Sequence, residues 1–447
     1  MSFPHWLPDA PEHTGALPDA CDLVIIGGGV IGVATALYAR RAGLSVVVLD
    51  KGRVGAEQST RNWGWIRTQG RDPAEIPISL ESRGLWADLN RDCQGRLGIA
   101  TVGVTYLAKS DTTLLGYQDW LESARGHGLD SRILSRRDLR ALMPQAADRW
   151  AGALHTPSDM RGEPWAAVPE LARLAAREGV VIREGCAVRG LDMVAGRVAG
   201  VVTEHGRIRA VRVVLAGGAW SALLMARHGV RIPQLSVRAT VLATEPVPDV
   251  QAGAATDSDF AWRRRDDGGY TLAPSAYSEL FIGPDAIRHT PVYLKLLAKG
   301  GFQVVPRLAA PRGYPDAWTT PRRWRNDEQS PFERCRILDP APPAAKVAQL
   351  PQQFAAAFPG QPAPKVSRAW AGMIDVLPDV VPIVDHCAAL PGLTVATGMC
   401  GHGFGIGPAF GRIVADMVQG KPAGHDMHRF RFGRFADGSR LTPGPNL

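Results

Sequence analysis

The amino-acid sequence predicts an α/β fold of mixed α+β character, in which a parallel-sheet domain is assembled from separate parts of the chain and a mixed-sheet domain is inserted between them. The order strand, glycine-rich turn and helix appears near the N-terminus and returns at 211–230 and 391–421. The segments between, about 85–150 and 235–365, are richer in Pro, Trp, Asp and Arg and carry hairpin signals. The 447 residues, 45% of them hydrophobic, suffice for two domains.

The first strand and turn carry the clearest motif. A buried strand, Leu23–Ile26, runs into Gly27-x-Gly29-x-x-Gly32, which is followed by a helix and a second strand that ends in Asp50. Gly27 suits the tight turn, Gly29 admits a pyrophosphate to the backbone, and Gly32 lets helix and strand pack closely. The helix N-terminus attracts phosphates, and Asp50 is placed to accept ribose hydroxyls. This stretch therefore predicts a Rossmann-like dinucleotide site.

The later elements complete the two domains. An amphipathic helix and a strand are expected at 170–193, and a hairpin follows them. Near the end, a strand runs into the glycine-rich loop Gly398–Gly407 before a last helix. We therefore predict the dinucleotide domain over 18–84, 151–234 and 366–432, and the inserted domain over 85–150 and 235–365.

Charge and cysteine usage exclude several functions. The net charge is +8, but the arginines are scattered, and the short run 262–267 is typical of a solvated strand end at a hairpin turn, so we expect no nucleic-acid partner. The six cysteines form no CxxC pair, so we expect no metal site and a reduced, cytoplasmic location. The longest uncharged run, 23–39, is too short to span a membrane, and the first 22 residues lack the basic region of a signal peptide.

Five segments, in the same order, resemble the FAD-dependent D-amino acid oxidase/dehydrogenase superfamily, which includes glycine oxidase and sarcosine oxidase. They are "DLVIIGGGVIGVATALYARRAG" with "VVLD", "STRNWGW", "VVLAGGAWS", "WAGMIDVLPDVVPIV" and "GLTVATGMCGHGFGIGPAFGRIVADMVQG". The resemblance implies that the dinucleotide is FAD. It also implies a Rossmann-like FAD-binding domain with an inserted mixed-sheet substrate-binding domain over the flavin ring.

The resemblance also implies a set of cofactor contacts. Asp50 would hold the adenosine ribose, Val188 the adenine region through its backbone, and Gly401 to Ile406 the flavin pyrimidine edge and ribityl chain. Gly64 would let the chain pass close to the ring. The full predicted set is Gly27, Gly29, Val30, Ile31, Gly32, Asp50, Lys51, Ser59, Arg61, Asn62, Trp63, Gly64, Val188, Ala216, Gly217, Trp220, Gly372, Gly401, Gly403, Phe404, Gly405 and Ile406.

Two departures from the family pattern concern substrate and cofactor. Ile374 stands where glycine-oxidase-like members carry the arginine that binds a substrate carboxylate. Asp375 beside it is either a site for a cationic amine or the cap of a turn. Gly372 stands where sarcosine-oxidase-like members attach FAD through a cysteine, so we expect FAD to be bound non-covalently, with Cys400 as a small buried residue.

Four residues are the candidates for a direct part in the chemistry. His402 is either an acid–base group or a residue that shapes its glycine-rich turn. Trp65, with Trp63, is expected to line the flavin or the substrate pocket. Arg67 is either the replacement carboxylate ligand or part of a salt bridge, and Asp375 is the fourth candidate.

The predicted reaction is the oxidation of the C–N bond of an amino acid or secondary amine, by hydride transfer to flavin N5, to an imine that hydrolyses. Two alternatives stay open: an FAD-dependent 2-hydroxy-acid dehydrogenase, and an FAD-binding subunit of a heteromeric amine or amino-acid dehydrogenase. The electron acceptor is O2 or a quinone. The strand 278–286 lacks the lysine by which sarcosine-oxidase-like members activate oxygen, which favours the quinone. Both a homo-oligomer and a heteromeric complex remain compatible with the sequence.

Overall fold

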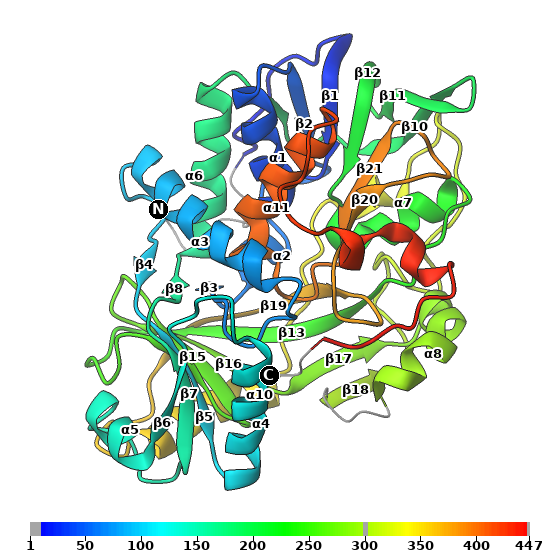
Figure 1. The fold of residues 1–447 in the computed structure, drawn as a ribbon. Helices are drawn as coiled ribbons and strands as arrows, with labels where there is room; N and C mark the ends of the chain where they lie inside the picture. Colours follow the sequence, from blue (N-terminus) through cyan, green and yellow to red (C-terminus); the bar gives the residue numbers. More distant parts are fainter. Residues whose placement is uncertain (1–9, 298–302, 445–447) are drawn as a thin grey trace.

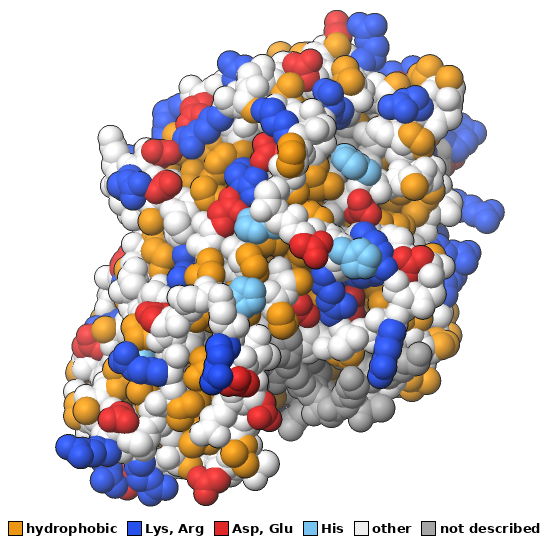
Figure 2. Space-filling model, viewed as in Figure 1, with side chains coloured by type: hydrophobic (Ala, Val, Ile, Leu, Met, Phe, Trp, Pro, Cys, Tyr) orange, Lys and Arg blue, Asp and Glu red, His pale blue; other side chains and the backbone are white. Residues whose placement is uncertain are grey.

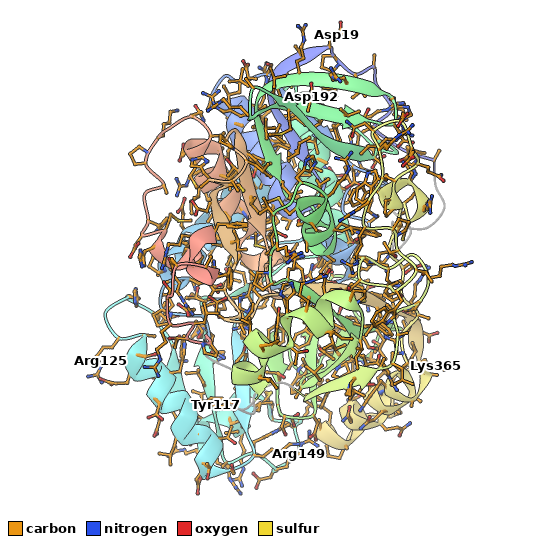
Figure 3. All side chains as sticks on the ribbon, turned by 90° about the vertical axis from the view of Figure 1, so that its right-hand side faces the viewer. Asp19, Tyr117, Arg125, Arg149, Asp192 and Lys365 are labelled. Carbon is orange, nitrogen blue, oxygen red and sulfur yellow. The ribbon has the colours of Figure 1, made fainter. Side chains whose placement is uncertain are left out.

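The computed structural model describes residues 10–297 and 303–444. Its strands form two large sheets and one small sheet. The large sheets occupy opposite halves of the molecule (Figure 1). In the view turned by 90°, Asp19 and Asp192 lie at one end, and Tyr117 and Arg149 lie at the other (Figure 3). The α/β arrangement with a second sheet agrees with the predicted fold class.

The first sheet has a parallel centre. Its order is β10-β11-β12-β1-β2-β9, with β21 paired to β12 and β20 to β21. Alternate residues of β1 enter two different cores: Leu23 and Ile25 pack with helices α1 and α11, whereas Val24 and Ile26 pack with α7. The strands are β1 (Ala20–Ile26), β2 (Val46–Leu49), β9 (Val181–Arg183), β10 (Val188–Val194), β11 (Arg197–Thr203), β12 (Gly206–Leu215), β20 (Ile383–His386) and β21 (Leu393–Thr397).

The second sheet is mixed, in the order β18-β17-β13-β16-β15-β14-β5-β7-β6, with β19 paired to β13. Two of its strands, β7 and β19, come from segments that the sequence analysis assigns to the dinucleotide domain. The domain boundaries therefore stay a prediction. Its strands are β5 (Val104–Ala108), β6 (Arg132–Ser135), β7 (Gly152–Thr156), β13 (Leu235–Thr244), β14 (Ala254–Thr256), β15 (Phe260–Arg264), β16 (Tyr270–Pro274), β17 (Tyr277–Phe281), β18 (Gln303–Arg307) and β19 (Val366–Val376). The small sheet pairs β3 (Trp65–Ile66) and β4 (Ala100–Thr101) with β8 (Met160–Arg161).

Helices cover the sheets and connect the two halves. The α-helices are α1 (Val30–Arg41), α2 (Gln58–Arg61), α3 (Ile76–Asp92), α4 (Asp111–Ser123), α5 (Arg136–Leu142), α6 (Pro164–Arg177), α7 (Ser221–Arg227), α8 (Pro284–Leu297), α9 (Pro331–Arg334), α10 (Ala344–Ala357) and α11 (Gly403–Met417). Three short 3-10 helices are η1 (Gly218–Trp220), η2 (His428–Phe430) and η3 (Phe432–Phe435). Helices α1, α3, α6 and α11 lie together beside the first sheet (Figure 1).

The predicted loop Gly398–Gly407 is shorter than we expect from the sequence, because α11 already begins at Gly403. Two glycines within α11, Gly407 and Gly411, serve the packing of this helix. A Cβ on Gly407 would lie 2.7 Å from Cγ2 of Val30, and a Cβ on Gly411 would lie 2.5 Å from Cβ of Ala34. Since both contacts are to α1, these glycines let α11 approach α1 closely.

The interpretation of 262–267 as a solvated strand end is wrong for Arg263. β15 and β16 do form the expected antiparallel hairpin, but the Arg263 side chain is fully buried. Its Nη1 and Nη2 donate to the two carboxylate oxygens of Glu163, at 2.8 and 3.0 Å. The Arg263 guanidinium can thus be buried because it pairs with a carboxylate 100 residues away in the chain. No local sequence pattern predicts such a partner.

Basic and acidic side chains are interspersed on the face seen in Figure 2. Within the described ranges, no helix is both long and apolar enough to cross a membrane. The same residues contain no group of three or more His, Cys, Asp and Glu side chains that could hold a metal ion. The cytoplasmic location stays a prediction.

Candidate cofactor and active site

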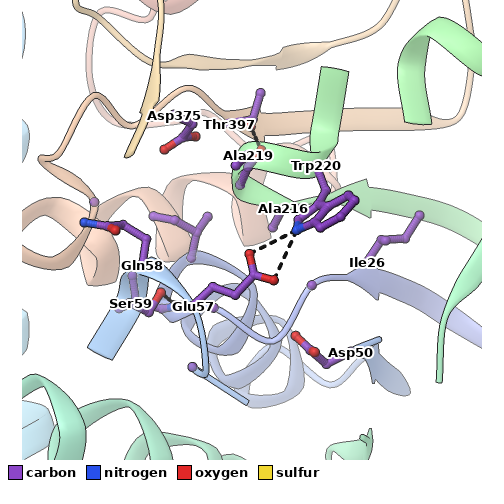
Figure 4. Close-up of a pocket in the computed structure, with 18 of the residues that line it drawn as sticks. Ile26, Asp50, Glu57, Gln58, Ser59, Ala216, Ala219, Trp220, Asp375 and Thr397 are labelled. Atoms are coloured by element: carbon purple, nitrogen blue, oxygen red, sulfur yellow. Dashed lines mark hydrogen bonds between the residues drawn. The ribbon is translucent and has the colours of Figure 1, made fainter. Parts of the chain in front are cut away.

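A large cavity, with about 1250 Å³ of empty space, lies at the carboxyl ends of the parallel strands. The ends of β1, β2, β12 and β21 reach it at Ile26, Asp50, Ala216 and Thr397 (Figure 4). Ligands of doubly wound α/β proteins bind at this edge of the sheet. Its lining comes from the glycine-rich turn, from Asp50 after β2 and from the residues that follow β12 and β21, which is where a dinucleotide lies in such folds.

The glycine-rich turn forms one wall of the cavity. A Cβ on Gly27 would lie 2.4 Å from the Ala216 carbonyl oxygen, and one on Gly32 would lie 2.0 Å from the Gly27 carbonyl oxygen. Gly32 therefore serves close packing of helix and turn, whereas Gly29 and Val30 line the cavity. Helix α1 begins at Val30 with no side-chain cap on Gly29, and Ser59 Oγ accepts a hydrogen bond from the Val30 N–H at 3.0 Å. The positive end of the helix thus faces the cavity.

Asp50 directly follows β2 at the cavity wall. Its Oδ2 accepts a hydrogen bond from the Gly28 N–H at 2.8 Å, and its Oδ1 accepts one from the Gly52 N–H at 2.7 Å. Burial raises the pKa of Asp50 to about 6, against the opposing charge of Lys51. The carboxylate is therefore held in place by backbone donors and retains lone pairs for hydroxyl groups of a ligand.

Glu57 is a charged wall residue that sequence reasoning missed. Its carboxylate accepts hydrogen bonds from Trp220 Nε1 and from the Leu338 N–H, and it pairs with Lys51 Nζ at 2.6 Å (Figure 4). Lys51 also lies over the Trp220 ring, 4.3 Å from its centroid. Glu57 therefore joins three segments that are far apart in the sequence.

Asp375 is the one candidate for direct chemistry that lines the cavity. Its Oδ2 accepts hydrogen bonds from the Gly398 and Met399 N–H groups, at 2.7 and 3.2 Å. Burial raises the pKa of Asp375. The carboxylate thus holds the loop after β21 against β19, and these partners lie in a distant loop rather than in the turn that follows Asp375. Its proposed contact with a substrate amine stays a prediction.

The tryptophans of "STRNWGW" lie beside the cavity and do not line it. The rings of Trp63 and Trp65 meet edge to face, with centroids 5.2 Å apart, and Trp65 packs on Tyr106 of the second sheet. Gly64 has a φ of +79°, and a Cβ there would lie 2.6 Å from the Gly162 carbonyl oxygen. In this structure, the positive φ and the contacts with Gly162 and Arg263 require glycine at position 64, and a role beside the flavin ring stays a prediction.

Arg67 and His402 belong to a buried polar cluster behind the cavity loop. Arg67 donates to the Gln69 carbonyl oxygen and lies over the Tyr106 ring, 5.4 Å from its centroid. His402 Nδ1 lies 3.1 Å from a carboxylate oxygen of Glu75. Burial and the neighbouring Arg71 lower the pKa of His402 to about 4, so the imidazole is neutral at physiological pH. Its contact with Glu75 is therefore a hydrogen bond.

Arg61 and Gly372 connect the segment after the turn to β19. Arg61 Nη1 donates to the Ala371 carbonyl oxygen at 2.9 Å and pairs with Asp339, and the guanidinium is fully buried. A Cβ on Gly372 would lie 2.1 Å from Gln58 Oε1. These two residues therefore support the wall in this structure rather than line the cavity.

The predicted cofactor residues divide into two groups. Those that line the cavity are Gly27, Gly29, Val30, Ile31, Asp50, Lys51, Ser59, Asn62, Val188, Ala216, Gly217, Trp220, Gly401, Gly403 and Phe404. Those outside its lining are Gly32, Arg61, Trp63, Gly64, Gly372, Gly405 and Ile406. Gly405 and Ile406 fall in the first turn of α11, where Gly405 faces Trp65 and Arg71 and Ile406 is buried. Their roles toward the cofactor stay predictions.

Sequence reasoning also missed several lining residues. They include Leu49, Arg53, Gly55, Ala56, Glu57, Gln58, Cys186, Leu215, Gly218, Ala219, Leu224, Phe332, Arg336, Met373, Ala396, Thr397 and Met399. Many of them adjoin a predicted residue and could be found by widening the motif. Phe332 and Arg336 could not, because they come from the predicted inserted domain and carry no motif of their own.

The family model "DAO: FAD dependent oxidoreductase" matches residues 22–417. The chain belongs to this family. The family resemblance inferred from the sequence is thereby confirmed, and so are the fold class and the membership of a family of FAD-dependent oxidoreductases.

The chain is also similar to individual proteins. It is 26% identical to the mitochondrial sarcosine dehydrogenase of Mus musculus over 61% of this chain, and it spans only 31% of that protein's length. It is 26% identical to the sarcosine oxidase subunit beta of Rhizobium meliloti, over 95% of this chain and 92% of the relative. The L-amino acid deaminase of Proteus myxofaciens, solved in complex with anthranilate, is 30% identical over 95% of both chains, with a TM-score of 0.90.

Proposed function

We propose that this DAO family chain binds FAD non-covalently and uses it to oxidise the C–N bond of an amino acid or secondary amine. The cavity carries this proposal: its glycine-rich turn, the N-terminus of α1 and Asp50 suit a dinucleotide. The relatives named above act on amino acids or on sarcosine by their names, which supports an amine substrate.

The chain's own residues would hold the cofactor and shield the reaction. Gly29 and Val30 would bind the pyrophosphate, Asp50 a ribose, and the loop at Gly401 the flavin end. Bound FAD supplies the hydride acceptor, N5 of its ring system. Buried aromatic side chains, among them Trp65 and Tyr106, would keep water from the substrate.

The state of the cysteines supports non-covalent binding. Cys186 is the cysteine that lines the cavity within the described part of the chain. Burial raises the pKa of its thiol to about 11, so the thiol is protonated and a poor nucleophile at physiological pH. Cys400 is also buried, and its Sγ contacts the Gly398 carbonyl oxygen at 3.0 Å.

A second candidate function is that of an FAD-binding subunit in a heteromeric complex. The similarity to a sarcosine oxidase subunit beta over 95% of this chain favours it. An electron acceptor other than O2, such as a quinone, fits both candidates. The 2-hydroxy-acid alternative needs a base near the hydroxyl, and neutral His402, bonded to Glu75, is not among the residues that line the cavity.

The test begins with the flavin absorbance of the purified full-length protein and its release on denaturation. Anaerobic bleaching is then measured with L- and D-amino acids, N-methyl amines and 2-hydroxy acids. Bleaching by an amine or amino acid supports the proposal. Bleaching only by a hydroxy acid would refute the C–N assignment, and flavin that stays with the denatured chain would refute non-covalent binding. Activity that appears only with a partner protein would support the second candidate.

A further inference from the structure

A buried carboxylate outside the lining of the cofactor cavity joins three segments of the chain. It belongs to Glu184, which directly follows β9 and whose side chain is 3% exposed. Its Oε1 accepts a hydrogen bond from the Val54 N–H at 2.8 Å. Its Oε2 accepts hydrogen bonds from the Glu12 and His13 N–H groups, at 2.6 and 3.2 Å. Because buried hydrogen bonds to a carboxylate are costly to lose, Glu184 ties the segment around Val54 to an N-terminal segment.

The segment around Val54 belongs to the cavity wall. In the loop 50–57, every residue except Gly52 and Val54 lines the cavity. The Gly55 N–H donates to the Gly28 carbonyl oxygen at 2.9 Å, and a Cβ on Gly28 would lie 3.2 Å from Cγ2 of Val54. The loop therefore packs against the glycine-rich turn. A displacement of Val54 would move both the loop and the turn.

The main chain beside Glu184 is bonded to the same loop. The Gly185 N–H donates to the Gly52 carbonyl oxygen at 2.9 Å, and the Cys186 N–H donates to the Asp50 carbonyl oxygen at 2.8 Å. Cys186 itself lines the cavity. The loop 50–57 is therefore supported by the backbone at its start and by the Glu184 side chain at Val54.

Residues 12–15, the N-terminal strap, lie along the edge of the first sheet. Thr14 forms an antiparallel bridge with Arg183 of β9, which is the last strand in the order of that sheet. The Glu12 carboxylate accepts two hydrogen bonds from Arg173 of α6, at 2.6 and 2.8 Å. The strap thus covers part of the open edge of β9 and is anchored at a second point on α6.

We propose that the N-terminal strap controls retention of the cofactor, and that Glu184 is the positioning residue through which it acts. With the strap in place, the Glu184 carboxylate is fixed on the Val54 N–H, and the loop 50–57 stays closed on the adenosine half of FAD. Without the strap, the carboxylate loses two of its backbone donors and is free to turn away from Val54. The inference rests on the proposed function, because it takes FAD to be the occupant of the cavity.

FAD and ADP test the strap without turnover, since ADP carries the adenosine and both phosphates of the cofactor. The flavin-free, full-length protein is titrated with FAD, and quenching of flavin fluorescence gives the Kd and the number of sites per chain. Displacement of FAD gives the Kd for ADP.

Three single variants carry the comparison. E184Q turns an NH2 group toward backbone N–H donors, so its Kd for both ligands should rise about 10- to 100-fold with an unchanged number of sites. E12Q weakens the partly exposed pair with Arg173 and should raise both values about 2- to 5-fold. E122Q, at a side chain that is 61% exposed, is the matched control and should bind like wild type.

The double variant E12Q/E184Q separates a strap that acts through Glu184 from two independent supports. Its Kd for FAD should match that of E184Q, because the strap no longer reaches Val54 through a carboxylate. The inference is overturned when E184Q or E12Q binds FAD as tightly as wild type, or when the two increases multiply in the double variant. It is also overturned when E184Q loses sites at an unchanged Kd, as a general folding defect would produce.

The same titration separates this inference from the proposed function. If wild type binds FAD and the variants bind it equally well, the strap fails and the proposed function stands. If wild type takes up no FAD, the proposed function fails and the strap fails with it.

Discussion

The indole nitrogen of Trp220 donates to both carboxylate oxygens of Glu57, at 3.1 and 3.0 Å, in the wall of the large cavity. Trp220 follows β12, whereas Glu57 follows β2 and precedes α2. Lys51 approaches the same carboxylate, so one side chain fixes three parts of the wall. The shape of the cavity therefore depends on a charge that makes no motif in the sequence.

Replacing Glu57 with Gln should lower the free energy of unfolding by about 1–3 kcal/mol, because Lys51 loses its carboxylate partner, keeping only two backbone carbonyl oxygens, and hydrogen bonds to a charged group become hydrogen bonds to a neutral one. Urea unfolding measures the change. E122Q, at a side chain that is 61% exposed, is the matched control and should change stability by less than about 0.5 kcal/mol. Equal midpoints for E57Q and wild type would contradict this role.

The Gly32→Ala variant should lose its cofactor. Its new Cβ would lie 2.0 Å from the Gly27 carbonyl oxygen, so the turn that faces the cavity must move. We expect the Kd of G32A for FAD to rise at least tenfold, which corresponds to a loss of about 1.4 kcal/mol or more in binding, and the flavin content per purified chain to fall accordingly. G116A, in α4 with open space around the new methyl group, should retain its flavin. Normal flavin content in G32A would contradict the assignment of the turn.

Cofactor affinity should fall as the pH is lowered through 6. Burial raises the pKa of Asp50 to about 6, so the group gains a proton below that pH. A protonated carboxyl accepts hydroxyl donors poorly, so the ionised form should bind FAD more tightly. We expect the Kd for FAD to rise about tenfold between pH 7 and pH 5. Quenching of flavin fluorescence reports the Kd, and D50N should show a flat profile over this range.

His402 should not shape the pH dependence of turnover near neutrality. Burial lowers the pKa of His402 to about 4, so its protonation state is constant above about pH 5. The H402N variant and wild type should therefore show kcat/KM profiles of the same shape between pH 5.5 and 8, even where their magnitudes differ. If kcat/KM of wild type rises or falls with pH in this range and kcat/KM of H402N does not, His402 again becomes a candidate acid–base group.

The sequence predicts local features better than distant contacts. The strand, turn and helix around Gly27 depend on neighbours in the chain, so their pattern alone indicates a dinucleotide site. Arg263 illustrates the opposite case, since its burial depends on Glu163, which no spacing connects to it. Likewise, the placement of Arg71 Nη1 opposite the buried carboxylate of Glu75, at 3.9 Å and without a hydrogen-bond partner among the described residues, is a property of the packed chain. For Trp65 the prediction is partial. The sequence motif singles the residue out, but only the structure shows that its ring packs on Tyr106.

The packing of α11 on α1 has a consequence for biosynthesis. The two helices begin at opposite ends of the chain, at Val30 and Gly403, and both begin at the cavity. Gly407 and Gly411 bring them into close contact. A nascent chain that has not yet released its last helix from the ribosome therefore lacks one wall of the cavity. The cofactor should accordingly be acquired only after α11 has been synthesised, and nascent chains stalled before Gly403 should bind no flavin.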